Sequence, residues 1–434
     1  MPRLKYASVA RVVVILGLFC LWLQIMLSAS GGGLYRDAEE LMNANDTSEQ
    51  VLALVPPELH KYLTVHPKNS TANSTEKISY KNITEIKRAI QRCNDAQLIY
   101  NEDIFGPVQN DTIIIAIQVH TRLTYLRHLI VSLAQAKEID RTLLIFSHDY
   151  YDEEINTLVR SIDFTKVMQI FYPYSIQTHP NEFPGMDPND CPRDTKFEQA
   201  VKLKCNNALY PDLHGHYREA KYTQTKHHWW WKANRIFNQL QCTAGHTGMV
   251  VFLEEDHYVA EDFIHMLGLL KSTADKSCPQ CEILSLGTYL KTYQYHVNSD
   301  KVEITPWHSS MHNMGFAFNR TVWSNILELQ DQFCAYDDYN WDYSLLHLSQ
   351  NRPGRDKFKV ILCKGPRVFH IGECGIHHKK SNCNASTVIS KVQKLLVNAK
   401  PYMFPSRVSA TVTAGGAKHN KKLVKGNGGW GDIR

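Results

Sequence analysis

Short apolar runs that alternate with helical segments constrain the fold of this chain more than any other feature. Residues 112–119 read TIIIAIQV, and residues 249–253 read MVVFL. Near-continuous apolar runs of this length are typical of strands buried on both faces. Similar runs lie at 143–146, 167–171 and 283–286, with helical segments near 125–136 and 261–270. The alternation predicts right-handed βαβ units, a mainly parallel sheet and an α/β fold.

The composition excludes several classes of protein. Of the 434 residues, 43% are hydrophobic, which is too many for a wholly disordered chain. The formal net charge is only +5, too mild for a dedicated nucleic-acid binder. We therefore expect a globular protein with a sizeable core and no nucleic-acid partner.

The amino terminus predicts the compartment. Residues 12–27 read VVVILGLFCLWLQIML, and this run continues through small residues to Ala29. Arg3, Lys5 and Arg11 precede it, so the positive-inside rule predicts a cytosolic tail at 1–11, a transmembrane signal anchor at 12–29 and a luminal remainder. A cleaved signal peptide is the alternative. Both routes deliver the rest of the chain to an oxidising lumen.

The segment after the anchor differs in texture from the rest of the chain. Residues 30–110 are polar and lack sustained strand periodicity, which predicts a partly helical luminal stem before a globular domain at 111–434. N-glycosylation motifs occur at Asn45, Asn69, Asn73, Asn82, Asn110, Asn319 and Asn384. Five of these seven lie before residue 111, and this clustering suits an exposed luminal stem.

An acidic cluster follows the buried run at 249–253. Glu254, Glu255 and Asp256 stand where that strand should end. Ligands bind beyond the carboxyl ends of parallel strands, and carboxylates there can hold a hard divalent cation. A solvated acidic turn remains an equal alternative on the pattern alone.

Several longer blocks carry a family resemblance. They read IFSHD at 145–149, NEFPG at 181–185, GHYREAKYTQTKHHWWWK at 215–232, FLEEDHY at 252–258, YDDYNWD at 336–342, CGIHHKK at 374–380 and GGWGDIR at the end. With them the chain resembles the Golgi N-acetylglucosaminyltransferases that act on N-glycans, specifically type II. The resemblance runs from about residue 115 to the end.

This resemblance implies a fold and an activity. It implies a GT-A glycosyltransferase fold, with a Rossmann-like sheet, on a single-pass type II Golgi membrane protein whose catalytic domain is luminal. The implied reaction moves GlcNAc from UDP-GlcNAc, with Mn²⁺, to O2 of the α-1,6-linked mannose of the N-glycan core. The implied product is a β-1,2 linkage, because the reaction inverts the anomeric carbon. N-glycans on glycoproteins would be the acceptors; homo-oligomerisation stays open.

The resemblance also assigns site residues. The metal ligands would be Asp256 and His370, although a lone histidine is more often a satisfied buried side chain. Asp342 would be the general base that takes the proton of the attacking hydroxyl. Contacts to the donor would come from Gln118, Val119, His120, Thr121, Arg122, Asp149, Gln224, Thr225, Lys226, His227 and His228.

The resemblance gives some of these residues specific roles, and at one position the chain departs from the family pattern. Arg122 or Lys226 would offset diphosphate charge, and Asp149 would accept a hydrogen bond from the uracil ring. A family arginine that contacts the donor is replaced around Tyr293, where Lys291 is the nearest substitute. The consecutive tryptophans at 229–231 are candidates for stacking on acceptor sugars, but helical geometry places at least one in the core.

The cysteines follow the family in part. The resemblance implies Cys191–Cys205, Cys278–Cys281 and Cys374–Cys383. Of the others, we expect Cys93–Cys242 and Cys334–Cys363, although sequence alone cannot determine connectivity.

Two other functions remain open at this stage. One is the related transferase that acts on the α-1,3-linked mannose. The other is a catalytically inactive Golgi glycan-binding protein of the same fold. Retention of a metal–base set argues against the second, because a binding module needs no general base.

Overall fold

The computed structural model describes residues 51–64, 83–290, 292–372 and 385–413. The chain divides into two compact units, 1–55 and 56–434, and all that follows concerns the second. The expected anchor and about half of the expected stem lie outside the described residues. Among the residues described, no helix is long and apolar enough to cross a membrane.

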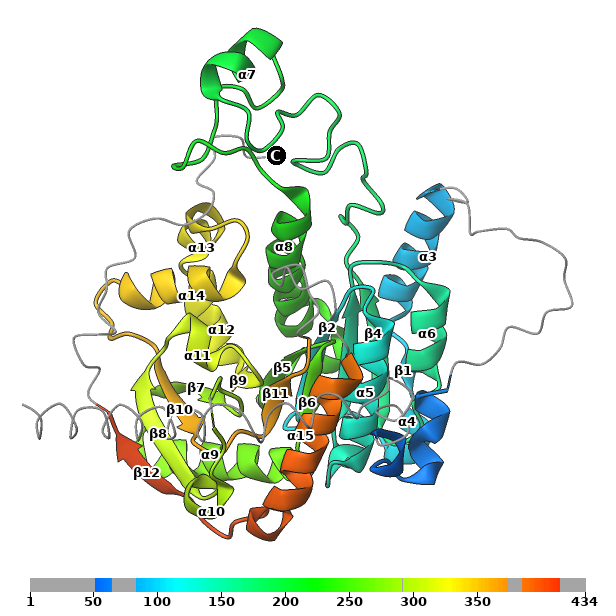
Figure 1. Ribbon diagram of the computed structural model, residues 1–434, viewed down its shortest axis with the longest axis vertical. Helices are drawn as coiled ribbons and strands as arrows, with labels where there is room; N and C mark the ends of the chain where they lie inside the picture. The colour runs from blue at the N-terminus through cyan, green and yellow to red at the C-terminus, as the bar shows by residue number, and fades with distance from the viewer. Residues whose placement is uncertain (1–50, 65–82, 291, 373–384, 414–434) are drawn as a thin grey trace, which may run out of the picture. The chain divides into compact units, whose positions relative to one another are not determined.

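Ten strands form one sheet, in the order β1-β4-β3-β2-β5-β9-β7-β10-β8-β12 (Figure 1). Their bounds are β1 Ile99–Tyr100, β2 Ile114–Val119, β3 Leu143–His148, β4 Lys166–Phe171, β5 Val250–Glu254, β7 Cys281–Ser285, β8 Lys301–Pro306, β9 Phe316–Phe318, β10 Lys359–Cys363 and β12 Ser409–Val412. A separate two-stranded sheet pairs β6 (His257–Val259) with β11 (Val368–His370).

The first half of the large sheet has the predicted parallel arrangement. Strands β4, β3, β2 and β5 are parallel neighbours, and every residue of β2, β3 and β4 is buried. Gln118 of β2 pairs with Ser147 of β3 and with Glu254 of β5. The carboxyl ends of these three strands therefore meet at one edge. In the other half β9 runs antiparallel to both β5 and β7, so the whole sheet is mixed.

Helices connect these strands. The α-helices are α3 Ile83–Ala96, α4 Glu102–Phe105, α5 Leu123–Gln135, α6 Glu153–Arg160, α7 Phe197–Leu203, α8 Ala220–Asn234, α9 Phe263–Ser277, α10 Tyr295–Asn298, α11 Ser309–His312, α12 Arg320–Leu327, α13 Gln330–Tyr336, α14 Trp341–Gln350 and α15 Ala385–Ala399. The 3₁₀ turns are η1 Pro57–Tyr62, η2 Ile139–Arg141, η4 Gln241–Thr243 and η5 Lys400–Tyr402, and η3 Arg235–Gln239 is a π-turn.

The sheet begins before residue 111. Strand β1 pairs antiparallel with β4, and helix α3 packs beside β4. The side chain of Asn94 in α3 donates to the carbonyl of Phe171 and accepts from its backbone N–H, at 2.7 and 2.9 Å. Residues from Ile83 onward therefore contribute to the sheet. Tyr62 of η1 is also buried on the domain, where its carbonyl accepts from Arg127 of α5 at 2.8 Å, so the stem stays a prediction only for the residues outside these segments.

Helix α8 is anchored by its tryptophans. Trp229 is fully buried and stacks on Trp341, with ring centroids 4.8 Å apart, and Trp230 and Trp231 pack against the same core. The prediction of a core role for at least one tryptophan is confirmed. The core contacts of all three argue against the alternative of an acceptor-stacking platform. Other residues of α8, Lys221, Gln224 and Thr225, face the carboxyl ends of the strands.

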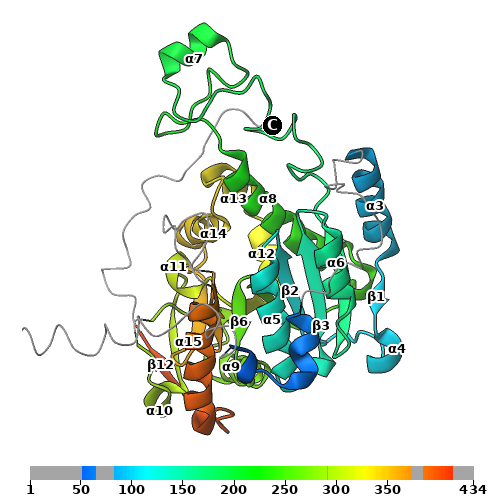
Figure 2. The ribbon, with the colours of Figure 1, turned by 45° about the vertical axis from the view of Figure 1, so that its right-hand side comes forward.

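A long excursion, residues 172–219, joins β4 to α8. It contains α7, which stands apart from the sheet in both views (Figures 1 and 2). The disulfide Cys191–Cys205 brackets α7, and its sulfurs pack with Ala200 and Tyr217 in a small core of their own. A bridge of this kind restricts loop freedom where the large core does not reach.

The disulfide predictions have mixed outcomes. Cys191–Cys205 and Cys278–Cys281 are confirmed, and Cys374–Cys383 lies outside the described residues. The expected pairs Cys93–Cys242 and Cys334–Cys363 are wrong, since all four cysteines are free thiols. Cys363 is sealed within β10, where burial raises its pKa to about 12, whereas Cys334 is exposed on α13. Cys93 and Cys242 lie half-buried on α3 and η4, and burial raises the pKa of Cys242 to about 11.

Candidate active site

A cleft of about 520 Å³ opens at the carboxyl ends of β2, β3 and β5. We call it the strand-end cleft. Its lining includes Gln118, His120, Arg122, Asp149, Lys221, Gln224, Thr225, Glu254, Glu255 and Asp256. It lies where ligands bind in open α/β sheets.

Asp256 and His370 are brought together by the small sheet. In the β6–β11 ladder His257 is the register partner of His370, and the N–H of Ile371 donates to the carbonyl of Asp256 at 2.8 Å. As a result Nε2 of His370 lies 3.2 Å from Oδ2 of Asp256. Two residues far apart in sequence therefore face each other beside the strand-end cleft.

This pair fits a divalent cation. The Oδ1 atom of Asp256 is buried and has no hydrogen-bond partner. Ligand atoms of Glu254, Asp256 and His257 lie within 4.8 Å of one another. Gly372 adds room, because a Cβ there would collide with the carboxylate of Asp256. Carboxylate oxygens with imidazole nitrogen suit Mn²⁺ and related ions.

Arg122 lies beside the Asp256–His370 pair, which we call the metal corner. Its guanidinium forms an ion pair with Oδ2 of Asp256 and donates to the carbonyl of Gly372 at 3.2 Å. Burial alone would raise the pKa of Asp256, but the hydrogen bond and charge of His370, with Arg122, hold that pKa well below its usual range. Burial would likewise lower the pKa of His370, and Asp256 raises it instead. These contacts therefore keep the Asp256 carboxylate ionised.

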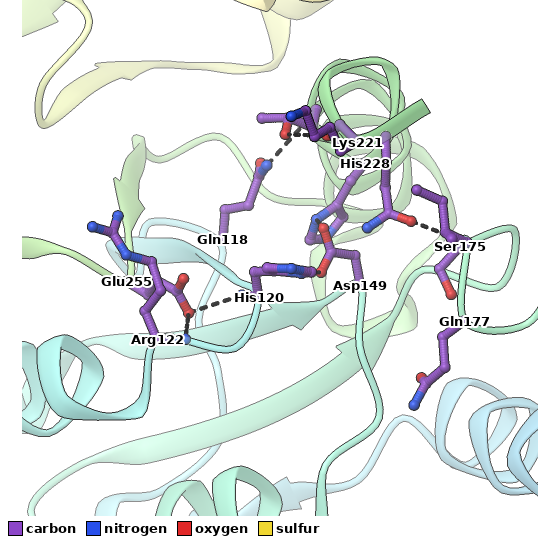
Figure 3. A network of polar contacts seen from close by, with 12 residues as sticks. Gln118, His120, Arg122, Asp149, Ser175, Gln177, Lys221, His228 and Glu255 are labelled. Atoms are coloured by element: carbon purple, nitrogen blue, oxygen red, sulfur yellow. Dashed lines mark hydrogen bonds and ion pairs between the residues drawn. The ribbon is translucent and has the colours of Figure 1, made fainter. Parts of the chain in front are cut away.

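The three acidic residues have different environments. Glu255 accepts hydrogen bonds from the backbone N–H groups of His120 and Arg122, at 2.9 and 3.2 Å, so it holds the loop after β2 in place (Figure 3). Burial raises the pKa of Glu255 to about 7. Burial also raises the pKa of Glu254, next to the buried ammonium of Lys232, whose pKa burial lowers. The cluster is therefore not a solvated turn.

Asp149 sits between two histidines (Figure 3). Its Oδ1 lies 2.6 Å from Nδ1 of His120, and its Oδ2 lies 3.3 Å from Nδ1 of His228. Nε2 of His228 is 2.8 Å from the hydroxyl of Ser147. Although burial opposes ionisation, these contacts keep the pKa of Asp149 well below its usual range. The carboxylate is thus an ionised acceptor in the cleft wall.

The predicted donor residues on α8 divide into two groups. Gln224 and Thr225 line the strand-end cleft; Gln224 also accepts from the N–H of Ile176 at 2.6 Å, and the Thr225 carbonyl accepts from Gln118 at 3.2 Å. Lys226 and His227 point elsewhere. Nζ of Lys226 donates to backbone carbonyls at the end of α13, including that of Phe333 at 2.7 Å. Of the two predicted cations, Arg122 therefore lines the strand-end cleft and Lys226 does not.

The remaining predicted residues have the following places. His227 binds Asp338 at 2.9 Å, and Asp338 pairs with Arg218 at 3.0 Å. Asp337 accepts from the N–H groups of Tyr339 and Asn340, so it holds the turn before α14. Val119 is buried and Thr121 is exposed, and neither is part of the cleft lining.

Asp342 lies in the first turn of α14. Its Oδ2 accepts from the side-chain amide of Asn313 at 3.1 Å, and its Oδ1 accepts from the N–H of Tyr343 at 2.9 Å. Burial raises the pKa of Asp342 to about 6. Its charge raises the pKa of Glu254 in the cleft lining, so the carboxylates of Asp342 and Glu254 are within electrostatic range of each other. The pKa of Asp342 is raised and that of Asp256 is lowered, so the two carboxylates have opposite shifts.

Sequence reasoning missed Glu255 as a loop anchor, Asn313 as the partner of Asp342 and Lys232 beneath the cleft. None has a spacing that marks it, since each role depends on tertiary contacts. Tyr293 packs on Phe369, with ring centroids 5.8 Å apart, and Lys291 lies outside the described residues.

Comparisons with known proteins agree on one family. The model of the family N-acetylglucosaminyltransferase II (MGAT2) matches residues 87–434. The alpha-1,6-mannosyl-glycoprotein 2-beta-N-acetylglucosaminyltransferase of Homo sapiens is 45% identical over 348 residues, covering 80% of this chain and 76% of that protein. Its Rattus norvegicus counterpart is 44% identical, with 80% and 77% covered. The Arabidopsis thaliana enzyme of the same name is 35% identical, with 77% and 75% covered. This chain therefore belongs to the N-acetylglucosaminyltransferase II family.

Proposed function

We propose that this chain, an N-acetylglucosaminyltransferase by family, moves GlcNAc from UDP-GlcNAc to O2 of the α-1,6-linked mannose of the N-glycan core. The relatives are named for that acceptor and for the β-1,2 product. One observation carries the proposal: Asp256 and His370, from distant segments, lie 3.2 Å apart beside the strand-end cleft, and the charge of Asp342 acts on Glu254 in the lining of that cleft. We further propose the GT-A arrangement for the fold.

The metal corner would hold Mn²⁺ through Asp256 and His370. When bound, such an ion stabilises the negative charge that develops on the departing diphosphate. Arg122 contributes a second positive charge at the same place. Asp149, Gln118 and Gln224 provide hydrogen-bonding groups along the cleft wall for the uridine half of the donor.

Asp342 would act on the acceptor. The mannose O2 attacks the anomeric carbon, the bond from that carbon to the phosphate oxygen breaks, and the hydroxyl proton passes to the Asp342 carboxylate. UDP leaves with the bonding electrons. One direct displacement inverts the α-linked donor to a β-linkage. A carboxyl with a pKa near 6 is ionised at neutral pH and is a stronger base than an ordinary carboxylate.

We place the protein in the Golgi membrane as a single-pass type II protein with N-glycans as acceptors. The apolar run at 12–29 and the preceding cations support this proposal. The disulfides Cys191–Cys205 and Cys278–Cys281 agree with an oxidising compartment.

Linkage analysis tests the proposal. The purified protein is incubated with UDP-GlcNAc, Mn²⁺ and two N-glycans, one with only the α-1,6-linked mannose free and one with only the α-1,3-linked mannose free. The expected result is a new β-1,2-linked GlcNAc on the first glycan. Transfer only to the second would support the related α-1,3 transferase. Glycan binding without transfer would support the inactive glycan-binding protein.

A further inference from the structure

Tyr289 is an exposed aromatic side chain beside the metal corner, and neither the family resemblance nor the family match gives it a role. It follows β7 at its carboxyl end, after Gly287 and Thr288. Its side chain is 53% exposed. An exposed ring close to buried carboxylates needs an explanation, since rings of this size usually bury their faces.

The backbone before Tyr289 is fixed. Gly287 bridges to Val368 at the start of β11, and its N–H donates to the carbonyl of Met314 at 3.1 Å. A Cβ on Gly287 would come within 2.7 Å of the Val368 carbonyl and 2.8 Å of Cβ of Met314, so only glycine allows this approach. The contact ties the Tyr289 segment to the strand that ends in His370.

The ring of Tyr289 lies close to His370. Its centroid is 6.3 Å from that of His370, and the two planes are inclined by 56°. The phenol is also within electrostatic range of Glu254, Asp256 and Asp342. Burial and then these charges raise the pKa of Tyr289, so the hydroxyl stays protonated.

This position coincides with the place the donor sugar must occupy. In the proposed mechanism the diphosphate is held near Asp256 and the attacking hydroxyl near Asp342, so the donor sugar would lie in this region. We propose that Tyr289 contacts the GlcNAc ring of the donor, with its aromatic face against the apolar C–H face of the sugar. The inference rests on the proposed function, because it assumes that the strand-end cleft binds UDP-GlcNAc.

Of the other aromatic side chains near the site, Tyr150 lines the strand-end cleft and packs edge-on against His120, with ring centroids 6.2 Å apart, and the rest pack elsewhere. The tryptophans of α8 pack in the core, and Tyr293 packs against Phe369. Among the described ring contacts, Tyr289 pairs only with His370, and the residue is 53% exposed, so part of its surface is open to a ligand. Binding pockets commonly use such rings to orient a ligand.

Calorimetry with two ligands tests the inference. UDP and UDP-GlcNAc share the nucleotide and differ by the sugar, and both are titrated in Mn²⁺ into the parent protein, Tyr289→Ala and Tyr289→Phe. The expected result for Tyr289→Ala is a roughly 3- to 10-fold loss of affinity for UDP-GlcNAc, the usual worth of one aromatic contact, with UDP affinity unchanged. Tyr289→Phe keeps the ring and should retain most of the affinity.

A matched control is available in Tyr402. It is 42% exposed, and its ring lies 6.4 Å from that of His296, a similar pairing on η5. Tyr402→Ala should bind both ligands like the parent. Equal losses of UDP and UDP-GlcNAc affinity in Tyr289→Ala would overturn the inference, since they indicate damage to the metal corner. Parent-like UDP-GlcNAc binding would overturn it as well.

Two further results separate this inference from the proposed function. If the parent protein binds neither UDP nor UDP-GlcNAc, the proposed function fails. If the parent binds both and Tyr289→Ala fails to fold, Tyr289→Phe and Tyr289→Leu decide the matter. Loss of sugar-dependent affinity in the leucine variant but not in the phenylalanine variant supports the aromatic contact, and equal affinity in the two contradicts it.

Discussion

The strand-end cleft and a second cavity of about 660 Å³ lie at opposite edges of the same sheet. The second, which we call the basal hollow, is lined by residues at the amino ends of β7 and β10, including Cys281, Glu282 and Lys359. It is the larger of the two. Several of its charges, however, are paired: Arg352 binds Glu282 with two hydrogen bonds of 2.6 and 2.7 Å, and Lys271 binds Asp275 at 2.6 Å.

The strand-end cleft differs because some of its carboxyl groups lack hydrogen-bond partners or have shifted pKa values. Asp256 keeps a buried oxygen without a partner, and Asp342 holds a pKa of about 6. Environments that drive the pKa values of neighbouring carboxylates apart are typical of acid–base sites. The comparison teaches that unbalanced polar groups at the strand carboxyl ends mark the site, and that cavity size does not.

The largest expected effect comes from Asp342→Asn in the cleft. The amide keeps the shape but removes the basic carboxylate, so kcat should fall by roughly 10²–10⁴, with little change in KM. Steady-state kinetics measure this, and UDP affinity should survive. A folded variant with parent kcat would remove Asp342 from the mechanism.

The next effect comes from Asp256→Asn. Because one anionic ligand is lost, Mn²⁺-dependent UDP affinity should fall by about 10- to 100-fold or more, a range already seen when only an outer partner of a ligand is removed. Calorimetry with UDP at fixed Mn²⁺ measures it. Unchanged affinity would show that the metal lies elsewhere.

The pH dependence should give about a tenfold change per unit. The ionised form of Asp342 is the active base, so kcat/KM should rise with pH, reach half its plateau near pH 6 and stay level above that. Since burial raises this pKa above its unfolded value, the fold favours the protonated form, and the stability it contributes at low pH is lost as pH rises through 6. Asp342→Asn should therefore melt no lower than the parent at pH 7. A kcat/KM profile with no limb near pH 6 would contradict the assignment.

The smallest effect is expected in the basal hollow. Asp275 forms an exposed ion pair with Lys271, and such pairs contribute about 0–1 kcal/mol. Asp275→Asn should leave kcat, KM and UDP affinity at parent values, which makes it the matched control for Asp342→Asn. A large loss of activity in this variant would break the contrast between the two cavities.

The sequence predicts the parts of this molecule that depend on local pattern. The buried runs at β2, β3, β4 and β5 are apolar because both faces of a parallel sheet are covered, so the local apolar pattern predicts their positions and a site at their carboxyl ends. The antiparallel placement of β9 did not, because a three-residue strand has no readable period.

The site residues, too, are predictable from the sequence only where a local pattern marks them. Asp256 is marked by its place after β5, whereas His370 reaches it only through the three-residue pairing of β6 with β11, and only the family resemblance identified it. Lys226 sits in a motif with cleft residues, yet one position on a helix turns it by about 100° toward α13. Whether two cysteines form a disulfide likewise depends on their distance in the folded protein, which their spacing in the sequence does not give.

Chelation tests the central claim most directly. The full-length protein is assayed for GlcNAc transfer to an N-glycan with a free α-1,6-linked mannose, before exhaustive chelation, after it, and after Mn²⁺ is restored. The account predicts loss of transfer on chelation and recovery with Mn²⁺, because Asp256 and His370 hold the ion that the leaving diphosphate requires. Full transfer by the chelated protein would contradict it.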